Sequence, residues 1–233
     1  MRMLLLAGLL ALSCSGCTHT TGRDFPRPEA AGLIPGKTVK NEVIAVYGIP
    51  DSQTSTFNSD FVAPATQPKS EFDAAAVGGA YSTIMYNYVQ STIPVAGGDV
   101  SIKRAIFGFR NDTLIAYNFT SNFPTESSDF DESKLSLIQK GKTTQAEIEA
   151  MLGRPTGEAV YPIVLTEGEK KAFYNHLAVN MATRKVEAKN LTVLFSPDGR
   201  VIDFRFNSRL ANMAPAPVAP APGFVPIVIP VHK

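Results

Sequence analysis

The stretch GKTTQAEIEAMLGRP, residues 141–155, repeats an earlier stretch of the chain, GKTVKNEVIAVYGIP, residues 36–50. Seven of the fifteen aligned residues are identical, and three further pairs are apolar in both copies. Two later matches follow in the same order, so we infer an internally duplicated unit of about 90 residues. These matches pair MYNY (85–88) with FYNH (173–176), and FRNDTLIAYNFTS (109–121) with FSPDGRVIDFRFNS (195–208).

The Gly-Lys-Thr at the start of both stretches is also the end of the phosphate-binding P-loop pattern, G-x-x-x-x-G-K-[ST]. The first glycine of that pattern is replaced by Ala31 in one copy and by Ser136 in the other. No apolar strand precedes either stretch, as a P-loop requires. We therefore expect no nucleotide binding.

A short helix explains more of the repeated letters. A threonine N-cap accepts a hydrogen bond from a free backbone N–H, and apolar residues at i, i+3 and i+4 form one buried stripe. A glycine in the left-handed conformation then ends the helix, and the following proline prevents its continuation. The predicted structural helix caps are Thr38, Gly48 and Pro50 in the first copy, and Thr143, Gly153 and Pro155 in the second.

Strict alternation of apolar and polar residues predicts strands after each helix. In residues 113–121 and 201–208 every second residue is apolar, which is typical of a strand with one buried face. Residues 82–90 and 171–179 supply the strand before each of these. The fold class predicted is α+β: two tandem copies of a small domain, each with one or two short helices packed on one face of an antiparallel sheet of three to four strands.

The two cysteines of the chain, Cys14 and Cys17, lie close to its start. They follow MLLLAGLLAL (3–12), an apolar run with the length of a signal-peptide core and too short to cross a bilayer. The run and the following SCSGC look like a bacterial lipobox, in which one cysteine is diacylated after cleavage. Cys17 is the first candidate for lipid attachment, such as palmitate, and Cys14 is the alternative. No Asp follows either cysteine, which resembles the enterobacterial sorting signal for the outer membrane and so implies a position on its periplasmic face.

The composition excludes several classes of function. A net charge of +1 and 44% hydrophobic residues fit an ordinary folded protein and give no indication of nucleic-acid binding. The three histidines, His19, His176 and His232, have no acid or nucleophile near them in sequence. Asp129 and Asp131 lie in a polar stretch and are expected to be solvated. We predict no enzyme activity, no catalytic residue, no metal and no cofactor.

The chain divides at changes of composition. Residues 214–222 alternate Ala and Pro, which predicts a stiff extended spacer, and FVPIVIPV (224–231) could lie along a sheet edge, a partner or a membrane. The predicted parts are a lipoprotein signal peptide (1–16), a tether (17–32), a first repeat (33–122), a linker (123–131), a second repeat (132–210) and an Ala/Pro-rich tail (211–233).

The pattern carried by GKTTQAEIEAMLGRPTG, KAFYNHL and LTVLFSPDGRVIDFRF resembles the SmpA/OmlA (BamE-like) outer-membrane lipoprotein family. Members of that family usually carry one such domain, whereas this chain has two. The resemblance implies a fold similar to the β-lactamase-inhibitor-protein domain. It also implies a lipid-anchored envelope scaffold that binds an unidentified envelope protein, as an accessory of outer-membrane protein assembly or envelope integrity. The alternative is an inhibitor-like protein that binds a periplasmic enzyme through its open sheet faces.

Overall fold

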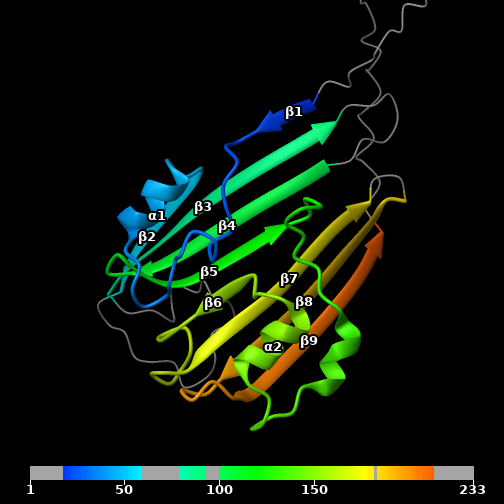
Figure 1. Cartoon of the computed structure of the whole chain (residues 1–233). Coiled ribbons are helices and arrows are strands. Elements are labelled where there is room, and N and C mark those ends of the chain that lie inside the picture. Colours follow the sequence, from blue (N-terminus) through cyan, green and yellow to red (C-terminus); the bar gives the residue numbers. More distant parts are fainter. Residues whose placement is uncertain (1–17, 59–78, 93–99, 181–182, 213–233) are drawn as a thin grey trace, which may run out of the picture.

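Each half of the chain folds as one short helix followed by four strands (Figure 1). The structure is a computed structural model that describes residues 18–58, 79–92, 100–180 and 183–212. The first half contains α1 (Lys40–Tyr47), β2 (Ser52–Asn58), β3 (Gly79–Thr92), β4 (Val100–Arg110) and β5 (Thr113–Ser121). The second half contains α2 (Gln145–Leu152), β6 (Gly157–Ala159), β7 (Lys170–Asn180), β8 (Lys185–Phe195) and β9 (Val201–Asn212). Strand β1 (Thr18–Thr21) precedes the first half, and the 3₁₀ helix η2 (Glu132–Leu137) lies between the halves.

Within the described residues, nine strands form one antiparallel sheet. Its order is β1-β3-β4-β5-β6-β7-β8-β9, and β2 pairs with the other end of β3. The strands predicted at residues 82–90 and 171–179 are confirmed as parts of β3 and β7. The two predicted helices are confirmed as α1 and α2.

The predicted fold class is wrong. Of the described residues, 50% lie in strands and 13% in three short helices, and the strands belong to a single sheet. The molecule is therefore not a pair of α+β domains that each pack helices on a separate sheet of three to four strands. The physical reason is β6, which pairs with β5 on one side and with β7 on the other and so continues the sheet from one half into the next.

The close approach of β5 and β6 depends on Gly157. A Cβ atom at this position would lie 2.5 Å from the carbonyl oxygen of Tyr117 and 3.1 Å from the Cα atom of Asn118. Any other residue would force the two strands apart, since real Cβ atoms do not approach so closely. A single glycine thus allows the two halves to share one sheet.

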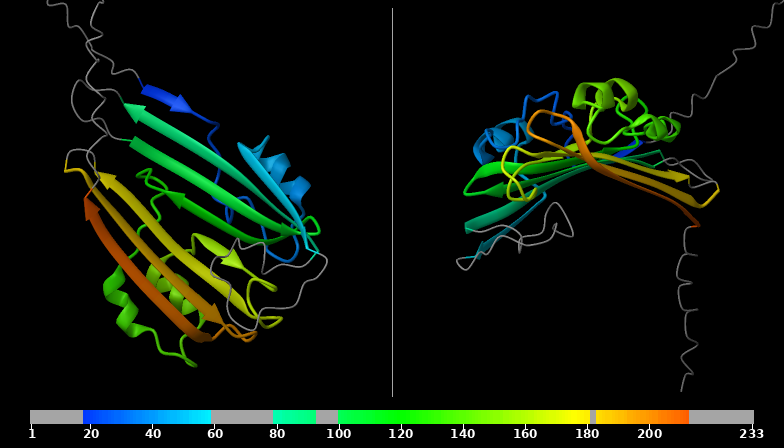
Figure 2. Two further views of the ribbon diagram at one scale, coloured as in Figure 1. Left: turned by 180° about the vertical axis from the view of Figure 1, so that it is seen from behind. Right: turned by 90° about the horizontal axis from the view of Figure 1, so that it is seen from below.

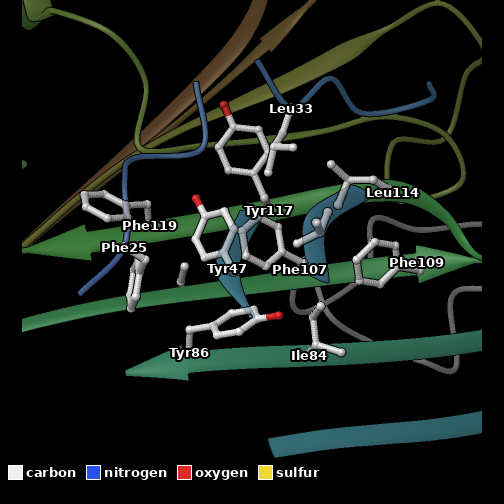
Figure 3. Packing of buried hydrophobic residues seen from close by; sticks show 12 residues of the cluster. Phe25, Leu33, Tyr47, Ile84, Tyr86, Phe107, Phe109, Leu114, Tyr117 and Phe119 are labelled. Atoms are coloured by element: carbon white, nitrogen blue, oxygen red, sulfur yellow. The ribbon is translucent and has the colours of Figure 1, made fainter. Parts of the chain in front are cut away.

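The helices lie on one side of the sheet, as the view from below in Figure 2 shows. Val43 and Tyr47 of α1 are buried among aromatic side chains of β3, β4 and β5, which surround the Tyr47 ring in Figure 3. Ile148 and Leu152 of α2 are buried in the corresponding way against β7, β8 and β9. Each half therefore has its own apolar core beneath one continuous backbone ladder.

The helix starts differ from the prediction by one residue. The N-caps are Val39 and Thr144, and not Thr38 and Thr143. Thr38 is buried, and its hydroxyl accepts a hydrogen bond from the backbone N–H of Ile34 at 2.9 Å; Thr143 accepts one from Gln139 at the same distance. Each threonine closes the turn before its helix, because its own backbone pairs with the sheet instead of entering the helix.

The helix ends follow the prediction. Gly48 and Gly153 are the C-caps, with φ angles of 83° and 84°, which glycine adopts without strain. Pro50 and Pro155 follow two residues later, outside the helices.

Candidate functional site

The face of the sheet opposite the helices, called here the open face, carries most of the polar side chains of the long strands. On β7 and β8 the buried side chains of Tyr174 and Leu191 point to the helices. Because neighbouring residues of a strand alternate between faces, Asn175 and Asn190 point to the open face. The two faces therefore differ in chemistry along the same strands.

A loop of the second half covers one end of the open face. Ile163, in residues 160–169, is fully buried and belongs to a cluster that includes Tyr81, Ile115 and Phe173 from three strands of both halves. Beyond this cluster the side chains are more accessible, and Leu177 is 38% exposed. The exposed part of the open face includes residues of β7 and β9, as well as Arg104 of β4.

A groove of about 460 Å³ runs along the open face where the two halves meet. Its lining comes from β4 and β5 of the first half and from β7 and β8 of the second. Its side chains supply alkyl groups, an aromatic ring, hydroxyls, amides and one guanidinium, without any carboxylate or thiol among the described residues. The imidazole of His176 points to the opposite face, because His176 has the same strand parity as Tyr174. The lining residues are Arg104, Ile106, Asn118, Thr120, Phe173, Asn175, His176, Leu177, Ala188, Asn190 and Thr192.

Three asparagines stand side by side at the second half of this face. Asn175 on β7 is directly opposite Asn190 on β8, which is directly opposite Asn207 on β9. Each amide has both donors and an acceptor, and none of these three side chains makes a hydrogen bond within the described ranges. The row can therefore satisfy hydrogen-bonding groups of a second molecule.

Arginine side chains give this face a positive character. Arg104 lies at the first-half wall of the groove, and its Nε donates to the amide oxygen of Asn87 at 2.8 Å. Arg205 and Arg209 lie on β9, opposite Thr192 and Ala188, and both are exposed. These guanidiniums favour a partner with negative charge.

The other side of the junction holds an ionic contact close to His176. His176 is buried, and its Nδ1 atom has no hydrogen-bond partner among the described residues. On the next strand, Lys189 donates to Asp129 at 3.1 Å. Burial opposes ionisation of Asp129, but this hydrogen bond and the nearby His176 hold the pKa of its carboxyl below the usual value. Asp129 therefore connects the linker to β8. The sequence-based expectation was that Asp129 is simply solvated, and the ion pair with Lys189 corrects it.

A smaller hollow of about 330 Å³ lies between the halves on the helix side. Arg27 and Glu29, which form an ion pair with each other, line it together with Arg154 and Tyr174. The charged groups of Arg27 and Glu29 are thus already paired within the chain. This hollow is a weaker candidate for a binding site than the groove.

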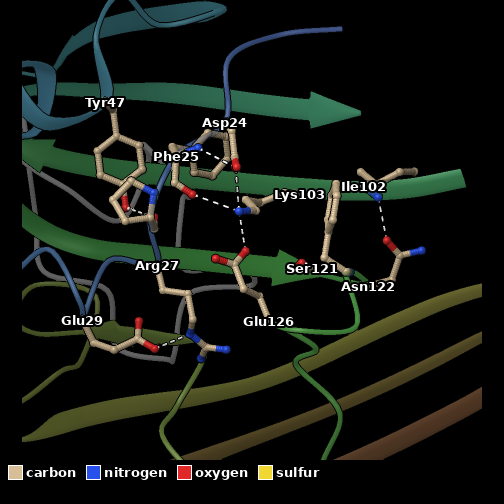
Figure 4. Close-up of polar contacts among 12 residues, drawn as sticks. Asp24, Phe25, Arg27, Glu29, Tyr47, Ile102, Lys103, Ser121, Asn122 and Glu126 are labelled. Carbon is tan, nitrogen blue, oxygen red and sulfur yellow. Dashed lines mark hydrogen bonds and ion pairs between the residues drawn. The ribbon is translucent and has the colours of Figure 1, made fainter. Parts of the chain in front are cut away.

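The buried Lys103 on β4 is the centre of an ionic cluster, shown in Figure 4. Its ammonium group bonds to Asp24 at 2.7 Å and forms an ion pair with Glu126. Burial alone would lower the pKa of Lys103, but the hydrogen bonds to the two carboxylates raise it above the usual value. Because Asp24 precedes the first helix and Glu126 follows β5, Lys103 joins both ends of the first half to the sheet.

The structure places the other predicted residues away from the groove. Cys17 and Cys14, the candidate lipid-attachment sites, lie outside the described residues, as does His232. His19 is on β1 and exposed. The carboxylate of Asp131 accepts from the backbone N–H of Ser133 at 3.0 Å and caps η2.

No three side chains of His, Cys, Asp or Glu gather into a possible metal site within the described ranges. Among the helices of those ranges, none combines the length and apolar character needed to span a bilayer.

The residues of the groove and Lys103 were not predicted from the sequence. Lys103 lies on the same face of β4 as Phe107 and Phe109. A charged residue on the apolar face of a strand was therefore the sequence feature that could have identified Lys103. The amide row was not detectable, because its members come from three strands whose register depends on the folded sheet.

Comparisons of the chain with protein-family models, with curated proteins and with solved structures give no match. The resemblance to the SmpA/OmlA family therefore stays a prediction.

Proposed function

We propose that this chain is a non-catalytic binding protein that engages a partner protein through the groove on its open face. The observation that carries the proposal is the groove itself, which combines alkyl contact surface with amide and guanidinium donors from both halves. Ligand sites for small molecules are mostly apolar with few polar groups, whereas protein interfaces mix apolar area with many hydrogen bonds. The amide-rich lining fits the second description.

We also propose that the protein is held at the periplasmic face of the bacterial outer membrane by a lipid on Cys17, or alternatively on Cys14. The support is the apolar run and the small residues before these cysteines. The partner is then an envelope protein, either a component of outer-membrane protein assembly or a periplasmic enzyme that the chain inhibits. An open sheet face supports the inhibitor-like alternative, and the family resemblance supports the assembly role.

Photo-crosslinking from the two faces of the sheet tests the binding site. A photoreactive residue at Asn190 lies in the groove, and one at Ala146 lies exposed on α2. We expect a crosslinked partner from position 190 and not from position 146. Ala188→Arg should fill the groove and abolish the crosslink, whereas Ala146→Arg is the matched control. Equal crosslinking from both faces would refute the proposal.

The anchor is tested separately. Chains with Cys17→Ala, Cys14→Ala or both changes are expressed in cells fed labelled palmitate. Label should disappear in one single variant and in the double variant. Label that persists in the double variant contradicts the anchor without affecting the proposed binding groove.

A further inference from the structure

The outer edge of β9 corresponds to the edge of β5 that pairs with β6 in the first half of the sheet. On β9 this edge has no described strand beside it. The aligned sequences place Val201 at the position of Leu114 and Phe206 at the position of Phe119. Both strands pair with a register shift at the same point. The shift lies between Gly108 and Phe109 of β4, which pairs with β5, and between Leu194 and Phe195 of β8, which pairs with β9. β9 therefore repeats the backbone geometry of β5.

Both strands begin with the same hydrogen bonds to the segment before the helix. Leu114 accepts from Gly36 at 2.7 Å and donates to Thr38 at 2.8 Å. Val201 accepts from Gly141 at 2.7 Å and donates to Thr143 at 2.8 Å. The two strands diverge only after this point.

Along β5 the second half continues the pairing. Strand β6 pairs with residues 116–118, and Phe119 donates to the carbonyl of Thr156 at 2.7 Å. Along β9 no described strand takes that place, since β9 ends the order of the sheet. Because Phe206 stands where Phe119 stands, its N–H points away from β8 and toward the free edge.

The apolar side chains next to this edge are also less covered than their counterparts. Ile115 is 4% exposed, whereas the equivalent Ile202 is 39% exposed. Phe119 is fully buried, and the equivalent Phe206 is partly exposed. Leu210, further along β9, is 67% exposed. An unpaired edge beside exposed apolar groups is the usual receptor for an added strand.

A second copy of the chain does not fit this edge well. In the first half β2 is the counterpart of β6, because Asp51 donates to Met85 at 2.9 Å as Thr156 donates to Phe173 at 2.7 Å. Head-to-tail addition would therefore place β2 of one molecule on β9 of another. Ser52 stands at the position of Gly157, and its Cβ atom would occupy the space that the close pairing of β5 and β6 leaves empty.

We propose that the outer edge of β9 accepts an extended strand of a partner protein with a glycine opposite Arg205. Acidic residues two and four positions before that glycine complete the recognition. In the register of β5 and β6, Asn118 is opposite Gly157, and Arg205 is the counterpart of Asn118. The first acidic residue then lies opposite Asn207, between Arg205 and Arg209, and the second lies opposite Arg209. Opposite charges placed across neighbouring strands stabilise their pairing.

The proposal is tested with a labelled peptide, Glu-Thr-Glu-Thr-Gly-Val-Ala-Val-Tyr, titrated with the full chain by fluorescence anisotropy. Valine in place of the glycine should weaken binding by roughly tenfold, because the added side chain prevents close pairing. Lysines in place of the glutamates should weaken binding by about fivefold to tenfold.

Charge reversal on the chain provides the matched test. The double variant Arg205→Glu/Arg209→Glu should prefer the lysine peptide over the glutamate peptide. Arg104→Glu, on the same face but in the groove, should leave peptide binding unchanged and so separates this site from the proposed groove. Circular dichroism checks that the variants fold.

Three results would overturn the proposal. These are equal binding of the glycine and valine peptides, an unchanged preference in the double variant, or a chain that light scattering finds to be dimeric at the concentrations used. The last result would indicate that a second copy occupies the edge.

Discussion

Tyr86 on β3 donates its hydroxyl hydrogen to the carbonyl oxygen of Gly48, the C-cap of α1, over 2.9 Å. Tyr174 on β7 makes the same hydrogen bond to Gly153, the C-cap of α2, over 3.2 Å. The last carbonyl groups of a helix have no partner within it, so each tyrosine supplies one from the sheet. Helix and sheet are thereby connected by the same polar contact in both halves.

Removal of either hydroxyl should destabilise the protein. Tyr86→Phe and Tyr174→Phe keep the buried ring and lose the hydrogen bond, so the free energy of unfolding should fall by about 1 kcal/mol in each. Urea unfolding followed by circular dichroism measures this change. Tyr88→Phe is the control, because the Tyr88 ring stacks on Phe123 and its hydroxyl makes no hydrogen bond in the described part of the chain. An equal loss in all three variants would contradict the interpretation.

The N-terminus of α1 can be improved by copying α2. Thr144 and Glu147 bond reciprocally at the start of α2, at 2.8 Å and 3.3 Å. At the start of α1, Val39 donates to Glu42 at 2.9 Å but has no side chain that accepts in return. Val39→Thr should raise the free energy of unfolding by about 1 kcal/mol, and Thr144→Val should lower it by a similar amount. Changes of the same sign in the two variants would disprove this.

The junction of the halves should be sensitive to a single methyl group. Gly157→Ala places a Cβ atom against the backbone of β5, and we expect a loss of about 3 kcal/mol in the free energy of unfolding. Gly141→Ala is the control. Its added Cβ contacts nothing within 4 Å, so only the strain of its positive φ of 73° remains, at about 1 kcal/mol. A larger loss at position 141 than at position 157 would argue against the close approach of the two strands.

The buried phenols should make the protein sensitive to alkaline pH. Burial raises the pKa of Tyr86 to about 12, and it raises the pKa of Tyr47, Tyr117 and Tyr174 further. The folded protein keeps these protons above pH 10, where the unfolded chain releases them, so stability is complete below about pH 10 and is lost as the pH rises through the folded pKa values.

Each such group should lower the free energy of unfolding by about 1.4 kcal/mol per pH unit in this range. Urea unfolding at a series of alkaline pH values, with tyrosinate absorbance as a second probe, measures the slope. Tyr86→Phe should reduce it. A flat stability up to about pH 12 would refute the prediction.

Lys103 should stabilise the first half through its two carboxylate partners. Lys103→Met keeps the alkyl stem and removes the charge, which leaves Asp24 and Glu126 without their cation. Because Asp24 is 64% exposed and can be rehydrated, we expect a loss of about 2 kcal/mol, less than for a fully buried pair. Asp24→Asn should cost less than about 1 kcal/mol. Thermal and urea unfolding of both variants test the order, and a larger effect of Asp24→Asn would contradict it.

The parts of the fold that follow local patterns were predictable from the sequence. Period-two alternation identified the strands β5 and β9, but it did not identify the irregularity that places Ile115 in a different cluster from Tyr117 and Phe119. Gly48 and Gly153 marked the helix ends, because a positive φ is a local requirement. The helix starts were predicted one residue early. Thr38 and Thr143 have the residue type of an N-cap, but their backbones are used by the sheet.

The single sheet was not predictable in the same way. Strand β6 has three residues, too few for any periodicity, and its pairing depends on Gly157 approaching Tyr117 from another part of the chain. The candidate groove arises from this junction, since its walls come from both halves. Local sequence patterns indicate the strands that form each wall of the groove. They do not indicate the strand pairing that brings the two walls together.

The three-residue strand β6 also has a thermodynamic consequence. A ladder so short could not hold two separate polypeptides together, because association must first compensate for the lost translational freedom of each. Within one chain the connecting segment already confines the second half near β5, at an effective concentration of about millimolar or more. The covalent continuity of the backbone through residues 122–156 thus acts as part of the contact, and a proteolytic cut there would turn a permanent pairing into a reversible one.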